Sequence, residues 1–129
     1  MTSRKRHIET LPSGLTILLN EYRFYPAVIF DMWIKAGSVD EGELDWGMAH
    51  FVEHMIFTGN AEFSKDKFYE MLFEIGGDDN AGTHEDVTNF YVVSTSEHFE
   101  KAFGLHHALI TSPKFPESEF FREREVVLE

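Results

Sequence analysis

The first half of the chain contains the sequence Gly47-Met48-Ala49-His50-Phe51-Val52-Glu53-His54-Met55-Ile56-Phe57-Thr58-Gly59. We expect a helix from about Gly47 to Phe57 in this stretch. Asp45 is the residue type that caps a helix at its start, and Gly59 is suited to end it. This helix and the elements expected on either side of it set the fold class.

Two extended segments are expected before this helix. Residues 15–20 form an apolar run after the turn signal Pro12-Ser13-Gly14, and residues 27–36 form a second run that ends at Gly37. We expect the two runs to pair as neighbouring strands. The acidic stretch over residues 38–46 is rich in small residues and is expected to be a surface loop.

Further elements follow the helix. Ser64 is expected to cap a second helix that stops at Gly76 and Gly77, and residues 78–84 and 87–94 predict a hairpin. A helix over about 97–110 comes next, and after two prolines a last helix begins near residue 117. This order predicts an α+β layered domain with a mainly antiparallel sheet, and no linker divides residues 1–129 into two domains.

Composition excludes several classes of function. The 129 residues are 43% hydrophobic, which is enough for a globular core. A formal net charge of −12 disfavours nucleic acids and anionic membranes as partners. With no cysteine, only histidine and carboxylate remain as strong metal ligands. The sequence shows no signal peptide or membrane span, so we expect a cytoplasmic protein, although a chain without cysteine is compatible with a reducing or an oxidising compartment.

The chemistry of the first helix lies in His50, Glu53 and His54. Residues four apart lie one turn along a helix and about 40° around it, so both imidazoles can face one point, which is the spacing of metal ligands. Glu53 lies at the edge of the same face, where its natural role is that of a general base. Zinc suits two imidazoles, although other divalent ions bind the same ligands.

A simpler interpretation is that His50 and His54 are partly buried core residues. Glu53 weighs against it, because a carboxylate among apolar neighbours is costly to bury without a charged partner, and a metal ion supplies one. The adjacent His106 and His107 point about 100° apart on a helix and cannot form a comparable pair, so we expect surface or packing roles for them.

The pattern H-x-x-E-H is the inverzincin signature, and the chain resembles the pitrilysin and insulinase family of zinc metallopeptidases. That family includes mitochondrial processing peptidases and bacterial processing proteases. Residues 47–59 resemble its block Gly-x-Ala-His-x-x-Glu-His-Met-x-Phe-x-Gly. The family's Asn-Ala-x-Thr…Thr-x-Tyr-Tyr strands are matched by residues 80–83 together with Thr88 and residues 90–91. Its Glu-Arg-x-x-Val-x-x-Glu helix is matched by residues 123–129.

The resemblance implies a role for each matching residue. His50 and His54 match the zinc ligands and Glu53 the catalytic base. Glu123 matches a second acidic residue of the catalytic site, which could orient a ligand histidine. The resemblance also implies helices packed on one face of the sheet, a peptide or unfolded protein as substrate, and a second homologous domain or subunit that closes the site. Residues expected to contact the substrate peptide are Asn80 and Ala81, which match the strand where the peptide adds.

The match has gaps. The family's third ligand is a glutamate seven residues after the one matched by Glu123, which corresponds to position 130, whereas the sequence ends at Glu129. Glu129 points about 100° away from the required direction and is only a fallback ligand. Gly82 stands where the family often has a bulkier residue. We therefore interpret residues 1–129 as a single N-terminal metallopeptidase domain, truncated before its natural end, which by itself can be inactive.

Two other interpretations remain. One is a non-catalytic scaffold or partner subunit of the same fold, but such proteins typically lack one of the three helix residues, and all three are present here. The other is a lyase resembling S-ribosylhomocysteinase, which shares the H-x-x-E-H helix. It uses a cysteine ligand, which this chain does not have. The sequence therefore favours a zinc-dependent metalloendopeptidase.

Overall fold

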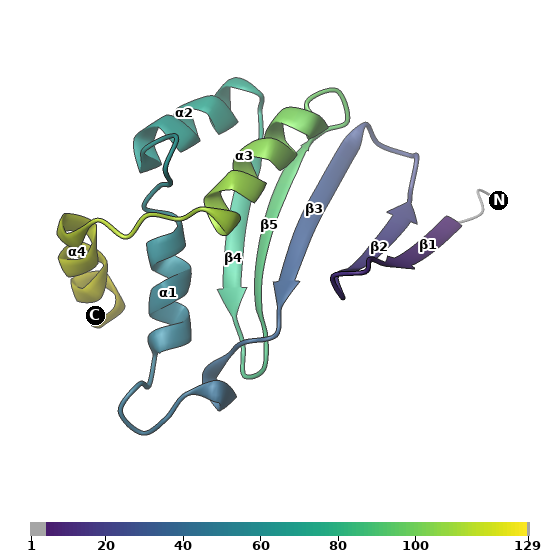
Figure 1. Cartoon of the computed structure of the whole chain (residues 1–129). Coiled ribbons are helices and arrows are strands. Elements are labelled where there is room, and N and C mark those ends of the chain that lie inside the picture. The colour runs from purple at the N-terminus through teal and green to yellow at the C-terminus, as the bar shows by residue number, and fades with distance from the viewer. Residues whose placement is uncertain (1–4, 129) are drawn as a thin grey trace.

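The fold is an antiparallel sheet with helices on one face, together with a separate hairpin (Figure 1). The computed structural model describes residues 5–128. A short 3₁₀ turn, Ser38–Asp40, precedes the first helix. The strands are β1 (Lys5–Thr10), β2 (Thr16–Glu21), β3 (Ala27–Ile34), β4 (Asp78–Thr83) and β5 (Thr88–Thr95), and the helices are α1 (Met48–Ile56), α2 (Lys65–Glu74), α3 (Phe99–Thr111) and α4 (Glu117–Leu128).

The strand pairing differs from the expectation at one place. The main sheet has the order β3-β5-β4 with antiparallel pairs, and β2 pairs with β1 in a two-stranded sheet. The predicted pairing of residues 15–20 with residues 27–36 is therefore wrong, and β1 was not predicted. The reason is local: Leu11 and Gly14 close a tight turn, in which Gly14 has a φ of 90°, so the polar segment before the turn folds back on β2.

One face of the main sheet is buried under helices and the other is open. Along β5 the side chains of Phe90 and Val92 point into the core, as the period of two requires. On the opposite face Ile29 and Trp33 of β3 are 66% and 60% exposed. The arrangement confirms the predicted α+β class. The buried core consists of Ile56, Phe68, Leu72, Ile75, Phe90, Val92, Ala102 and Leu109.

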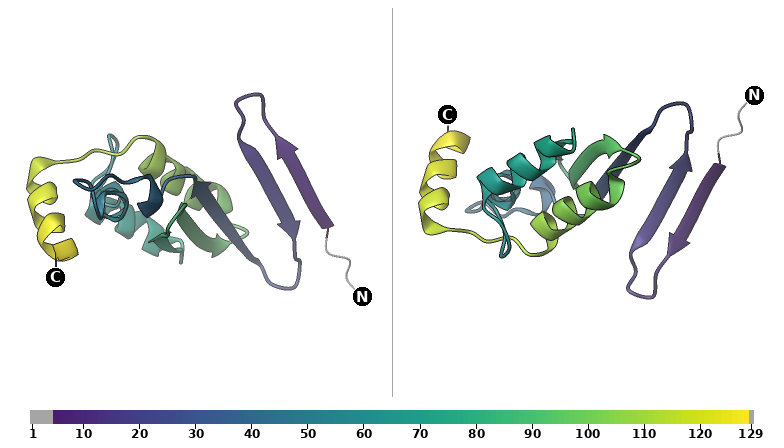
Figure 2. Two further views of the ribbon diagram at one scale, coloured as in Figure 1. Left: turned by 90° about the horizontal axis from the view of Figure 1, so that it is seen from below. Right: turned by 90° about the horizontal axis from the view of Figure 1, so that it is seen from above.

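The ends of the molecule lie apart from this core. Figure 2 shows the β1–β2 hairpin at one end and α4 at the other, with the sheet and helices α1 to α3 between them. Both strands of the hairpin are exposed on both faces. Within residues 5–128, no helix is long and apolar enough to cross a membrane.

The first helix starts differently from the prediction. Its N-cap is Gly47, with a φ of 86°, and no side chain of that residue can cap it. The Glu41 carboxylate instead accepts hydrogen bonds from the backbone N–H groups of Gly47 and Ala49, each at 2.8 Å. The predicted cap Asp45 is therefore wrong, because a longer side chain from the preceding loop reaches the free N–H groups. The predicted Ser64 cap of α2 is confirmed, since its hydroxyl accepts from the Lys67 N–H.

Stability should depend on pH through His106, which is fully buried against the edge of the Phe30 ring. Neither ring nitrogen has a well-aligned hydrogen-bond partner among the described residues. Burial lowers the pKa of His106 below 6.5, and the backbone of Phe90 and the charge on Asp31 offset this only in part. Below pH 6.5 the unfolded chain therefore binds the proton more readily than the folded chain does.

Above pH 6.5 His106 is neutral in the folded and the unfolded chain, so its contribution to the free energy of unfolding should be constant. Below pH 6.5 we expect the free energy of unfolding to fall by up to about 1.4 kcal/mol per pH unit. Urea unfolding of the wild type and of His106→Leu between pH 5 and 7.5 gives the slope of the free energy of unfolding against pH for each protein. The exposed His107→Leu is the control and should keep the wild-type slope. Equal slopes for the wild type and His106→Leu would contradict the prediction.

Candidate metal centre

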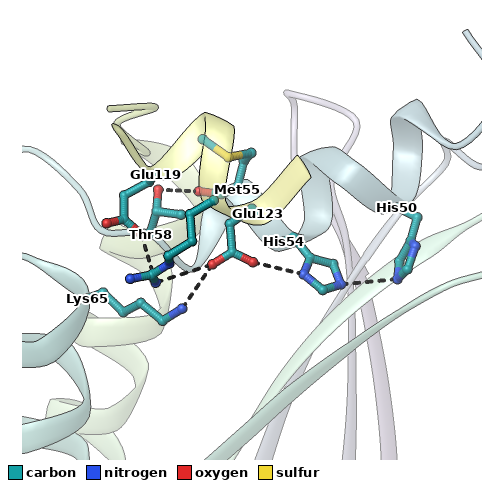
Figure 3. A network of polar contacts seen from close by, with 8 residues as sticks. His50, His54, Met55, Thr58, Lys65, Glu119 and Glu123 are labelled. Atoms are coloured by element: carbon teal, nitrogen blue, oxygen red, sulfur yellow. Dashed lines mark hydrogen bonds and ion pairs between the residues drawn. The ribbon is translucent and has the colours of Figure 1, made fainter. Parts of the chain in front are cut away.

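Two histidines of α1 direct their ring nitrogens at each other. The Nε2 atoms of His50 and His54 lie 3.2 Å apart, and the two rings are nearly perpendicular. Figure 3 shows both side chains on the same side of the helix. The helix itself produces this arrangement, since side chains at i and i+4 lie one above the other.

The separation of these nitrogens fits a zinc ion. Zinc binds imidazole nitrogen at about 2.0–2.1 Å in tetrahedral geometry, which places two such nitrogens about 3.3 Å apart. The observed separation is 3.2 Å. The two side chains could therefore hold zinc without moving, and in the absence of a metal the same separation is that of a hydrogen bond between the two rings.

Glu123 of α4 lies behind His54, on the side away from His50. His54 Nδ1 donates to Glu123 Oε2 at 3.2 Å (Figure 3). A proton on Nδ1 leaves the Nε2 lone pair free for a metal ion, which is how carboxylates commonly orient ligand histidines. The family resemblance predicted that Glu123 belongs to the site, and the structure places it in contact with His54, 69 residues away along the chain.

The charge of Glu123 is compensated in its buried position. Its other oxygen, Oε1, accepts from Lys65 Nζ at 3.2 Å and lies 3.5 Å from Arg122. Burial alone would raise the pKa of this carboxyl, but hydrogen bonds from His54 and Lys65 and the charge of Lys65 outweigh it and hold the pKa below 4.5. Glu123 is therefore ionised at neutral pH and favours the Nδ1–H form of His54.

Glu53 of α1 is tied to the sheet by a residue of β4. The Thr83 hydroxyl donates to Glu53 Oε2 at 2.5 Å. This contact fixes one carboxylate oxygen and leaves the other, Oε1, for a further partner. The carboxylate is thereby held in the cavity that His54 also lines.

The cavity brings most of the predicted residues together. Its volume is about 270 Å³, and its lining includes five of the six predicted site residues, all except His50: Glu53, His54, Asn80, Ala81 and Glu123. Asn80 and Ala81 lie on β4, the edge strand of the sheet order β3-β5-β4. The Asn80 side chain accepts a hydrogen bond from the Ala81 N–H at 2.8 Å. The strand edge expected to meet a peptide therefore borders the cavity.

A third ligand does not come from the described residues. Within 5–128, no group of three histidine, aspartate or glutamate side chains could hold a metal ion. The fallback ligand Glu129 lies outside the described residues, and a glutamate at position 130 stays a prediction. Two nitrogens alone make an incomplete zinc site.

Three residues of the site were missed by sequence reasoning. Lys65 donates a hydrogen bond to Glu123, and Asp79 lines the cavity. Thr83 donates a hydrogen bond to Glu53. Thr83 had a signal, because it belongs to the matched Asn-Ala-x-Thr block. Lys65 and Asp79 had none, since each reaches the site only through the packing of α2 and β4 around α1.

Several proteins of similar sequence are named as zinc proteases or as processing peptidase subunits. Residues 16–129 match the model of the insulinase family, peptidase family M16. An uncharacterised zinc protease of Rickettsia felis is 32% identical over 95% of this chain and 30% of its own length. A probable mitochondrial-processing peptidase subunit beta of Arabidopsis thaliana is 30% identical over 99% of this chain and 24% of its own length.

Structural comparison agrees with the sequence match. A crystal structure of a protease from Helicobacter pylori superposes with a TM-score of 0.87 at 27% identity, covering 96% of this chain and 30% of that one. The chain thus spans less than a third of the length of these relatives. The resemblance drawn from the H-x-x-E-H helix is confirmed, and the chain belongs to the insulinase family of peptidases, peptidase family M16.

Proposed function

We propose that this chain is the N-terminal, metal-binding domain of a longer zinc metalloendopeptidase. His50 and His54 would bind one zinc ion, and Glu53 would be the general base. The observation that carries the proposal is the 3.2 Å approach of the two Nε2 atoms, with Glu123 fixing the tautomer of His54 from behind. The names of the relatives support zinc as the metal.

The proposed reaction is hydrolysis of a peptide bond. Bound zinc would polarise the scissile carbonyl and lower the pKa of a coordinated water to about 7. Glu53 takes a proton from the attacking water as the C–O bond forms, and gives that proton to the amine nitrogen as the C–N bond breaks. Thr83 keeps the Glu53 carboxylate pointed at the cavity during both transfers.

The substrate would be a peptide in extended conformation. Strand β4 has β5 on one side and, within residues 5–128, no strand on the other. A peptide can add to such an edge through backbone hydrogen bonds. Asn80 and Ala81 would contact it there, beside Glu53.

The rest of the proposed site lies beyond this chain. A glutamate at position 130 would be the third ligand, since it falls two helical turns after Glu123 on the same face of α4. A second homologous domain or subunit would close the cavity over the substrate. The length of the relatives supports this view, because this chain matches only 24–30% of them.

The proposal is tested by zinc content and zinc affinity in the protein that contains this chain and continues past position 130. We expect about one zinc per wild-type chain and none in His54→Ala. Glu123→Gln removes the carboxylate that orients His54 and should weaken zinc affinity by about 10- to 100-fold. Elemental analysis and competition with a zinc chelator measure the two quantities.

The exposed His107→Ala serves as the matched control and should bind zinc like the wild type, since His107 stacks on Phe103 away from the site. Zinc that survives in His54→Ala would place the metal elsewhere. A wild-type protein that binds no zinc would favour the alternative, a non-catalytic scaffold or partner subunit of the same fold. The presence of His50, Glu53 and His54 together argues against that alternative.

A further inference from the structure

Lys65 is the first residue of α2, a position where a positive charge does not help the helix. The start of a helix carries a partial positive charge, so acidic side chains are favoured there, and the next residue, Asp66, is of that kind. The Lys65 side chain instead reaches α4, where its Nζ atom donates to Glu123 Oε1 at 3.2 Å. A lysine at this position is therefore explained by Glu123 and not by the stability of α2.

The contact of Lys65 with Glu123 is the outer end of a row of four side chains. Glu123 Oε2 accepts from His54 Nδ1 at 3.2 Å, and His54 Nε2 lies 3.2 Å from His50 Nε2 (Figure 3). Each oxygen of the Glu123 carboxylate thus has a partner of its own. The two oxygens of a carboxylate share one plane, so a partner that fixes Oε1 also sets the direction of Oε2.

Burial limits what else could hold Glu123 in place. Its side chain is only 7% exposed, so water can hardly replace a lost partner. Arg122 is a second cation near Oε1, but it lies 3.5 Å from that oxygen and only 2.9 Å from Glu119. Lys65 is the closer of the two cations. Without it the carboxylate would be free to turn towards Arg122 and away from His54.

We propose that Lys65 is a positioning residue of the metal site that acts through Glu123. It holds Oε1 so that Oε2 faces His54 and keeps the proton of the imidazole on Nδ1. His54 Nε2 then stays available to a metal ion. The proposal rests on the proposed zinc site for the identity of the metal, whereas the effect of Lys65 on the His54 tautomer is a property of this chain alone.

The charge of Lys65 and its positioning role affect zinc affinity in opposite directions. A positive charge near the site repels a zinc ion, so removal of that charge alone would tighten zinc binding. Loss of the hold on Glu123 would weaken zinc binding, because the partners of ligand histidines contribute about 10- to 100-fold to metal affinity. The sign of the change in Lys65→Met therefore distinguishes a positioning residue from a simple counter-charge.

The first test measures zinc affinity by competition with a zinc chelator at pH 7.5, in the protein that contains this chain and continues past position 130. Methionine keeps a long apolar side chain but has no charge. We expect Lys65→Met to bind zinc about three- to tenfold more weakly than the wild type, a smaller loss than in Glu123→Gln. Lys65→Arg keeps a charged donor and should stay within about twofold of the wild type.

A double variant shows whether Lys65 acts through Glu123. In Glu123→Gln no carboxylate remains to be held, so the addition of Lys65→Met should weaken zinc binding no further. Lys67→Met is the matched control on the same helix. Lys67 is exposed, pairs with Glu70 at 2.8 Å and does not line the cavity, so this variant should bind zinc like the wild type.

The second test observes the His54 tautomer and needs no metal. Nitrogen NMR of isotope-labelled histidine, in the zinc-free protein that contains this chain, distinguishes a ring protonated at Nδ1 from one protonated at Nε2. The His54 signal is identified by its loss in His54→Ala. We expect the Nδ1–H form in the wild type and in Lys65→Arg, and a mixture of the two forms in Lys65→Met. Near-ultraviolet circular dichroism checks that each variant is folded.

Three results would overturn the proposal: zinc affinity in Lys65→Met equal to or higher than that of the wild type, an equal loss in the Glu123→Gln background, or a His54 ring that keeps Nδ1–H without Lys65. Failure of the metalloendopeptidase proposal is a different outcome. A wild type that binds no zinc refutes that proposal, and the His54 tautomer then decides the role of Lys65. A wild type that binds zinc, with both readouts unchanged in Lys65→Met, refutes only the role of Lys65.

Discussion

Replacing Glu53 by glutamine should lower the turnover number for peptide hydrolysis by about 10²- to 10⁴-fold, because glutamine keeps the shape of the side chain but cannot accept the proton. The expected loss lies in kcat, since Glu53 would act in the chemical step and not in holding the peptide. A quenched fluorescent peptide and the zinc-loaded protein that contains this chain provide the assay. The same preparation should retain about one zinc, because Glu53 is not proposed as a ligand.

Thr83→Val is the companion variant. It removes the hydroxyl that donates to Glu53 Oε2 and leaves the base itself in place. We expect a smaller loss of kcat than for Glu53→Gln, with zinc content unchanged. If Glu53→Gln kept wild-type activity, another group would have to be the base and the proposed mechanism would be wrong.

The second large effect concerns the core that positions the site. Phe68 of α2 has no exposed surface and stacks against Phe63 within the main cluster. Phe68→Ala should lower the free energy of unfolding by about 3–5 kcal/mol, through lost burial and the cavity left behind. Whole domains are stable by only about 5–15 kcal/mol, so the loss is a large fraction of the total. Urea unfolding followed by circular dichroism measures it.

Phe73→Ala is the control in the same helix. Phe73 is 85% exposed, so the same chemical change should cost less than about 1 kcal/mol. Similar losses in the two variants would mean that α2 is not packed on the sheet as described. Because α2 also carries Lys65, the Phe68 variant should in addition weaken the contact between Lys65 and Glu123.

Part of the fold follows from short stretches of sequence. The Ser64 cap, the double glycine after α2 and the β-branched run of β5 each act over a few residues, and the structure has the corresponding elements. Strand pairing is less local. An apolar strand such as β3 can satisfy its hydrogen bonds with any suitable neighbour, and the burial of Phe30 under α3 favours β5 over β2. The error at β2 arose from assuming that consecutive strands pair.

The same division applies to the site. The amino-acid sequence by itself determined the pairing of His50 with His54 and the nearby placement of Glu53, because a helix fixes the geometry of residues three and four apart. Only the tertiary structure decided what surrounds them. Glu123 meets His54 across 69 residues, and Thr83 meets Glu53 across 30. Such contacts depend on how α4 and β4 pack against α1, which no local spacing encodes. The histidine pair therefore follows from helix geometry, whereas Glu123 was reached only through the family resemblance and the role of Thr83 only through the structure.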